Sequence, residues 1–193
     1  MNTQVIIVGA GPVGLTLAID LGRRGVRCVL LEQKEAPQFL PKMERCNART
    51  MEIYRRLGIA QKIRDAGFPR EVPMDVFIVT SLVEPPLLHL PYPSVAQAQA
   101  EIAACADGSM PLEPYQLISQ YTLEPVLKSI AETLPGIDVC YGHEFISLRA
   151  RRHLGACSHQ TRHHDDRIER AVPGGMRRRS EQCATPTGHK APR

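Results

Sequence analysis

Hydrophobic residues near the start of the chain fall into two patterns joined by glycines. Val5–Val8 is an unbroken β-branched run, which predicts a strand buried on both faces. Apolar residues at helical spacing follow from Pro12 until Gly25, and a second buried run, Cys28–Leu31, ends at Glu32. The chain is therefore expected to begin with a strand, a glycine-rich turn, a helix and a second strand that ends in an acid.

Weaker patterns predict the elements that follow. We expect helices at about 47–56, 59–66 and 116–134, weak helical character at 95–106, and strands at 74–79, 137–141 and 144–148. The proline-rich segment 84–93 is expected to be irregular or an edge strand. Pro125 is expected to kink the last helix or to divide it in two. Strands alternating with helices predict the α/β class with a parallel sheet.

The glycine-rich turn has the spacing of a dinucleotide-binding loop. Gly9 allows a tight exit from the strand, and Gly11 allows the backbone to approach a pyrophosphate closely. Gly14 allows the helix to pack against the strand. Pro12 suits the first helical turn, which continues with Val13, and the exposed N–H groups and positive dipole end of this helix favour a bound anion.

The second strand supplies the other half of such a site. A carboxylate at Glu32, followed by Gln33, stands where it can accept hydrogen bonds from a ribose diol. Strand, turn, helix, strand and acid in this order make the motif much more specific than its glycines alone. The alternative is a glycine turn that binds nothing. The candidate dinucleotide-binding residues are Gly9, Gly11, Pro12, Val13, Gly14, Glu32 and Gln33.

Length and composition limit the function classes. The 193 residues suffice for one domain, and Met1–Gln4 lead straight into a strand without the segments of a signal peptide. No apolar run is long enough to span a bilayer, so we expect no membrane association. The six cysteines show neither a CxxC pair nor a metal-binding spacing, which predicts free thiols in a cytoplasmic protein and no metal site.

Three segments resemble the flavin-dependent aromatic hydroxylases, the group A monooxygenases related to p-hydroxybenzoate and phenol hydroxylases. They are VIIVGAGPVGLTLAIDLGRRGVRCVLLEQ, ERCNARTMEIYRRLGIAQKI and LISQYTLEPVLKSIAETLPGIDVCYGHEFISL. The likeness covers about residues 4–148. Its second and third segments distinguish this family from NAD(P)-dependent Rossmann dehydrogenases.

The resemblance implies a three-layer, FAD-binding Rossmann-like domain, of which residues 1–149 form the N-terminal part. It implies FAD as cofactor, NAD(P)H as reducing co-substrate, O2, and a small aromatic, phenolic substrate that is hydroxylated. The glycine loop would hold the pyrophosphate and Glu32 the ribose, whereas Arg45 and Gln120 would contact the cofactor nearer the flavin. Arg49 competes with Arg45 for this role, and catalytic residues stay unassigned.

The composition changes at Ala150. Residues 150–193 contain few large apolar side chains and five of the seven histidines, which predicts a basic, low-complexity, disordered tail. The run His163–Asp166 offers adjacent ligand types, but adjacent residues rarely converge on one ion. No aromatic residue interleaves with the basic run Arg177–Arg179, so we expect no nucleic-acid partner.

A shifted reading frame accounts for this tail. The family carries a Cys-Asp-Gly motif after this point, and the in-frame tail lacks it. If the codons for residues 176–180 are ATG CGA CGG CGG TCG, reading one nucleotide later gives Cys-Asp-Gly-Gly-Arg. We therefore hypothesise that residues from about Ala150 onward are a frameshift product, and that the chain as written is truncated and inactive. The alternative is a natural low-complexity extension.

Three other function classes stay open, one of them an NAD(P)-dependent Rossmann dehydrogenase. Other flavoprotein oxidoreductases, such as amine oxidases and reductases, also begin with GxGxxG and an acid at the strand end. Alternatively, the chain is a non-catalytic FAD- or nucleotide-binding fragment whose basic tail binds an acidic partner.

Overall fold

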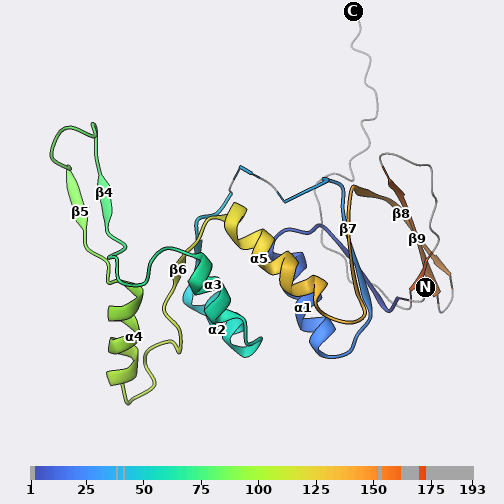
Figure 1. The fold of residues 1–193 in the computed structure, drawn as a ribbon, viewed down its shortest axis with the longest axis horizontal. Coiled ribbons are helices and arrows are strands. Elements are labelled where there is room, and N and C mark those ends of the chain that lie inside the picture. Colours follow the sequence, from blue (N-terminus) through green and yellow to red (C-terminus); the bar gives the residue numbers. More distant parts are fainter. Residues whose placement is uncertain (1–2, 38, 41, 152–153, 162–169, 173–193) are drawn as a thin grey trace, which may run out of the picture.

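The centre of the fold is a parallel sheet made of β1 (Val5–Val8), β2 (Cys28–Glu32) and β7 (Ile137–Tyr141), in the order β1-β2-β7. The computed structural model describes residues 3–37, 39–40, 42–151, 154–161 and 170–172 (Figure 1). Strand β2 lies between its two partners in parallel register, with Val8 opposite Leu31 and Glu32 opposite Tyr141. The carboxyl ends of the strands therefore share one edge of the sheet, where ligands of such folds bind.

Helices cover one face of this sheet and a strand covers the other (Figure 1). Helices α1 (Pro12–Arg23) and α5 (Gln120–Glu132) lie side by side, and their apolar faces share one core with the sheet. On the opposite face, Phe145 of β8 (His143–Arg151) packs against Val29 and Leu31. The predicted α/β class and its three layers are confirmed.

Strand β8 continues into an antiparallel sheet with β9 (Leu154–Thr161) and β10 (Arg170–Val172). These strands differ from the expected tail without regular structure, since β8 crosses the expected boundary at Ala150. Antiparallel pairing is made by main-chain groups, which every residue except proline supplies in full, so it requires no apolar pattern. The runs His163–Asp166 and Arg177–Arg179 lie outside the described residues.

Two short helices follow the first βαβ unit. Helix α2 (Ala48–Arg56) begins after Asn47, whose side-chain oxygen accepts a hydrogen bond from the N–H of Thr50 at 2.8 Å. Helix α3 (Ala60–Ala66) follows the turn at Gly58, whose φ of +61° favours glycine. Both helices agree with the predicted bounds to within one residue.

A hairpin and a further helix extend from this body (Figure 1). Strands β4 (Val76–Ile78) and β5 (Leu88–Leu90) pair antiparallel, which agrees with the expected strand at 74–79 and with a short edge strand in the proline-rich segment. Helix α4 (Val95–Ala104) is capped by Ser94, which exchanges hydrogen bonds with Gln97 in a capping box.

The predicted helix at 116–134 is wrong at its start. Gln116–Leu117 forms strand β6, which pairs antiparallel with β3 (Arg45–Cys46), and α5 begins only at Gln120. Gln116 is fully buried, and its side chain bonds main-chain carbonyls, which holds the backbone extended. Pro125 lies within α5 without dividing it.

Candidate functional site

The glycine loop lies at the carboxyl edge of the parallel sheet, between β1 and α1. Gly9 has a φ of +99°, in the region that favours glycine, and its N–H donates to the Leu31 carbonyl at 2.7 Å. A Cβ on Gly14 would clash with the Gly9 carbonyl oxygen. Both glycines are therefore required by the protein's own packing.

Gly11 is different, because the protein's packing does not require glycine there. Its φ of −72° suits any residue, and an added Cβ would meet nothing closer than Glu124 Oε1 at 3.9 Å. Gly11 is the N-cap of α1, which has no side-chain cap and no acid in its first turn. Free N–H groups and the helix dipole thus face an open position, and these features fit the pyrophosphate of FAD.

Glu32 holds this loop from the neighbouring strand. Its Oε2 accepts a hydrogen bond from the Ala10 N–H at 2.9 Å, and its Oε1 accepts one from the Lys34 N–H at 3.0 Å. Each carboxylate oxygen has further acceptor capacity, so a ribose hydroxyl can be added. The adjacent side chain of Gln33 is exposed, as is Val13 on the first turn of α1.

Gln120 is buried at the start of α5, and its carboxamide is bonded at both ends. Oε1 accepts from the Lys42 N–H at 2.9 Å, and Nε2 donates to Glu124 Oε1 at 2.6 Å. Gln120 therefore joins the segment before β3 to the helix that lies against the glycine loop. Sequence reasoning missed Glu124, which is buried beside Gly11. Its position four residues after Gln120 on a helix was the available signal.

The structure separates the two candidate arginines. Arg45 lies on β3, lines a pocket and makes only a 3.6 Å ion pair with its neighbour Glu44. The Arg49 side chain is 76% exposed on α2 and pairs with Glu52 at 3.2 Å. The structure thus places Arg45 where it can meet a ligand and Arg49 on the helix surface.

The pocket beside Arg45 has a volume of about 630 Å³. Its walls come from β3 and β6, the end of α3, β4, and the start of α5. Aromatic side chains from four separate segments line it: Phe68, Phe77, Tyr92, Tyr115 and Tyr121. No sequence pattern joins these residues, so the sequence analysis missed them. An aromatic wall with one arginine suits a planar, anionic or polar ring system.

Asp75 also lines this pocket, at the base of the β4–β5 hairpin. Its Oδ2 lies 2.7 Å from Nε2 of His89, and its Oδ1 accepts a hydrogen bond from the Tyr92 N–H at 2.9 Å. The Tyr92 main-chain bond, and then the His89 contact, lower the pKa of Asp75 below its usual value. Asp75 is therefore an anion at neutral pH.

The described ranges contain neither a cluster of metal ligands nor a membrane-spanning helix. Within them, no three His, Cys, Asp or Glu side chains gather as metal ligands would. No helix in the same part of the chain is long and apolar enough to cross a membrane.

A glycine loop before an uncapped helix, with an acid at the end of the next parallel strand, defines a dinucleotide-binding protein. Residues 2–168 match the family model described as "FAD binding domain". The chain therefore belongs to the FAD-binding domain family of the FAD-dependent monooxygenases, whose named members are enzymes. Its resemblance to group A flavin monooxygenases is confirmed, with FAD as the cofactor. Membership of this family argues against an NAD(P)-dependent dehydrogenase.

Relatives and solved structures agree with this assignment. The chain is 37% identical to the FAD-dependent monooxygenase apdD of Emericella nidulans over 150 residues. The aligned region is 77% of this chain and 24% of that protein. It is 26% identical to phenol 2-monooxygenase of a Pseudomonas species over 147 residues. This aligned region is 76% of this chain and 23% of that protein. The substrate-free rebeccamycin biosynthetic enzyme RebC superposes with a TM-score of 0.75 at 25% sequence identity. The superposed region is 89% of this chain and 32% of the RebC chain. The matched region thus spans about a quarter of the curated relatives' length.

Proposed function

We propose that this chain carries the FAD-binding part of a hydroxylase that acts on an aromatic, phenolic substrate with NAD(P)H and O2. The observation that carries the proposal is the open position in front of Gly11. There, uncapped N–H groups of α1 face a space beside the Glu32 carboxylate. When bound, FAD supplies the redox chemistry with NAD(P)H and O2.

The residues of the chain have distinct roles in this proposal. The N–H groups at the start of α1 hold the pyrophosphate, with Gly11 leaving room for it, and Glu32 accepts a hydrogen bond from the ribose. Gln120 and Glu124 hold the surrounding segments in place. Arg45 lies on the side of the pocket, where the flavin end and the aromatic substrate would meet.

The aromatic pocket and the relatives' names support the substrate class. Aromatic rings stack on aromatic side chains, and the pocket offers five of these. The relative named phenol 2-monooxygenase points to phenols. Cys28, Cys46 and Cys105 are free thiols, which supports a cytoplasmic location.

A non-catalytic FAD-binding chain is the second candidate. In that case the chain binds FAD and does not couple NAD(P)H oxidation to hydroxylation.

Two measurements test these proposals. Titration of the purified chain with FAD, followed by quenching of flavin fluorescence, should give saturable binding that NAD⁺ does not compete away. Absence of saturable binding would refute the proposed cofactor site. Phenol-dependent NAD(P)H oxidation with stoichiometric hydroxylated product would establish the hydroxylase, whereas FAD binding without turnover would favour the second candidate.

A further inference from the structure

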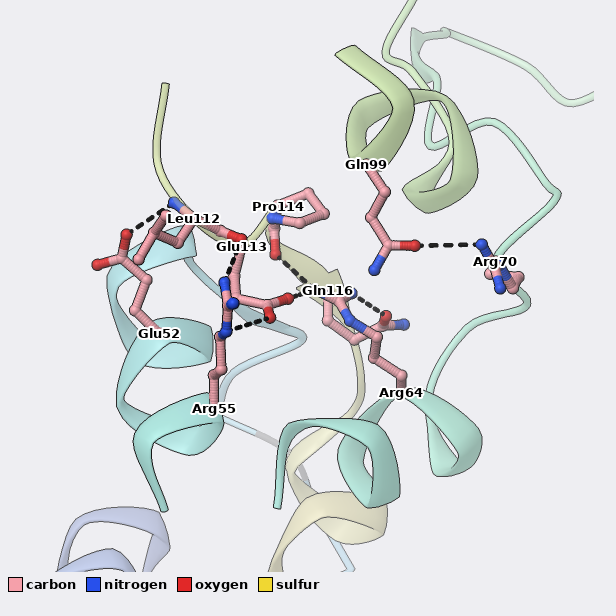
Figure 2. Close-up of polar contacts among 9 residues, drawn as sticks. All are labelled: Glu52, Arg55, Arg64, Arg70, Gln99, Leu112, Glu113, Pro114 and Gln116. Carbon is pink, nitrogen blue, oxygen red and sulfur yellow. Dashed lines mark hydrogen bonds and ion pairs between the residues drawn. The ribbon is translucent and has the colours of Figure 1, made fainter. Parts of the chain in front are cut away.

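An extended segment between α4 and α5 is held against α2 and α3 by charged side chains (Figure 2). We call this segment, Leu112–Leu117, the strap. At its start, the Leu112 N–H donates to Glu52 Oε1 at 3.0 Å, and the Leu112 carbonyl accepts from Arg55 Nη1 at 3.2 Å. Glu52 and Arg55 both lie on α2, so this helix holds the first residue of the strap through both of its main-chain groups.

Arg64 of α3 makes the central contacts. Its Nη2 donates to Glu113 Oε2 at 2.6 Å and to the Pro114 carbonyl at 3.1 Å, and its Nη1 donates to Gln116 Oε1 at 3.1 Å. The Arg64 side chain is only 7% exposed and that of Glu113 only 13%. A buried guanidinium with these partners binds three residues of the strap at once, and removal of one partner would leave a buried charge unpaired.

Gln116 continues the connection towards the core. Its Nε2 donates to the carbonyls of Phe68 at 3.0 Å and Leu117 at 2.9 Å. A Cβ on Gly67 would lie 2.6 Å from this Nε2, so the glycine leaves room for the carboxamide. The strap therefore fits the end of α3 by shape as well as by charge.

The strap carries groups of the candidate site on its far side. Tyr115, which lies between two residues that Arg64 binds, lines the aromatic pocket. Leu117 pairs with Arg45 across β3 and β6. Beyond the strap, the Ile118 N–H donates to the Glu44 carbonyl at 2.9 Å and the Gln120 N–H to the Met43 carbonyl at 3.1 Å.

We propose that Arg64 is a positioning residue for the cofactor site. By holding the strap on α3, it fixes the β3–β6 pairing that places Arg45 and the start of α5. Arg64 itself contacts only the strap residues in its hydrogen bonds. The inference rests on the proposed FAD site.

Amide hydrogen exchange on the full chain tests the first part without any ligand. In Arg64→Met and the milder Glu113→Gln, we expect the Ile118 and Gln120 amides to exchange about tenfold faster or more. The Gly9 amide, which bonds Leu31 across β1 and β2, should keep its rate. Arg70→Met is the matched control, because Arg70 is 61% exposed and donates to Gln99 away from the strap (Figure 2). Unchanged exchange at the Ile118 and Gln120 amides, or an equal increase at Gly9, would overturn the proposal.

FAD affinity tests the second part. We expect FAD to bind about 10- to 100-fold more weakly to Arg64→Met, by analogy with the loss of side chains that orient metal ligands. Glu113→Gln should show a smaller loss and Arg70→Met none. Faster exchange at Ile118 and Gln120 with unchanged FAD affinity would refute positioning and leave a purely structural role. If the wild-type chain bound no FAD, the proposed function would fail, and the exchange rates would still decide whether Arg64 holds the strap.

Discussion

The carboxylate of Glu32 accepts a hydrogen bond from the main-chain N–H of Ala10, with 2.9 Å between Oε2 and the nitrogen. Its second oxygen accepts from the Lys34 N–H at 3.0 Å. One side chain at the end of β2 therefore fixes the glycine loop through protein contacts alone. The acid of the motif thus has a structural role in shaping the loop beside its proposed role towards the ribose.

Removal of this carboxylate should weaken FAD binding. In Glu32→Ala the proposed site loses the charge-assisted hydrogen bond from the ribose, worth about 1.5–3 kcal/mol, so we expect about a 10- to 100-fold higher Kd for FAD. Asp20→Ala is the control, since Asp20 pairs only with Arg24 on the surface of α1. The test is titration of each variant with FAD, and equal affinities for Glu32→Ala and wild type would contradict the prediction.

Alanine substitutions separate the two kinds of glycine in the loop. Gly14→Ala should destabilise the protein by about 3 kcal/mol, because its Cβ clashes with the Gly9 carbonyl. Gly11→Ala should change stability by less than about 0.5 kcal/mol, since its Cβ enters open space. It should nevertheless lower FAD affinity strongly, because that space would hold the pyrophosphate. Urea unfolding and FAD titration measure the two effects, and normal FAD binding by Gly11→Ala would locate the cofactor elsewhere.

The parts of this site that the sequence predicted are local. Strand, turn and helix in residues 5–32 follow from short-range pattern, and the structure agrees with them to within a residue or two. The contacts of Gln120 with Lys42 and of Arg64 with the strap could not be predicted, because these partners lie 78 and 49 or more residues away in the chain.

Residues 116–119 show why local pattern also fails. Their apolar spacing continues that of α5, so it predicted helix. Tertiary contacts decide otherwise, because the buried Gln116 carboxamide bonds the Phe68 carbonyl and the backbone pairs with β3. The aromatic pocket is hidden from sequence reasoning for the same reason, since its walls meet only in the folded chain.

Stability should fall at alkaline pH through Tyr54, which is buried between α1 and α2. Burial raises the pKa of Tyr54 to about 12, although a hydrogen bond from Thr16 opposes the shift. The unfolded phenol ionises near pH 10, so its contribution is full below pH 10 and is lost as pH rises from about 10 to about 12. Two pKa units correspond to about 3 kcal/mol.

The Tyr54→Phe variant isolates this effect. Burial also raises the pKa of Cys28 and Cys46 to about 11, so wild type alone would mix several groups. We expect the difference in unfolding free energy between wild type and Tyr54→Phe to shrink as pH rises from 10 towards 12. Urea unfolding followed by circular dichroism at a series of pH values measures it. A pH-independent difference would show that Tyr54 ionises normally in the fold.

The final prediction concerns the reading frame of the gene. We propose that residues from about Ala150 onward are read one nucleotide out of frame. The identity to two curated relatives extends over 150 and 147 of the 193 residues, whereas the family model matches on to residue 168. The shifted codons around Met176 can spell Cys-Asp-Gly-Gly-Arg, a motif that the flavin hydroxylases carry after this point.

Sequencing from the codon for Phe145 to a few hundred bases past Arg193 should therefore show one missing or extra base near Ala150, followed by a long open frame. If the bases are confirmed as written and no such frame follows, the tail is a natural extension. A chain cut after Leu148 would then be the control for any acidic partner that the basic residues bind.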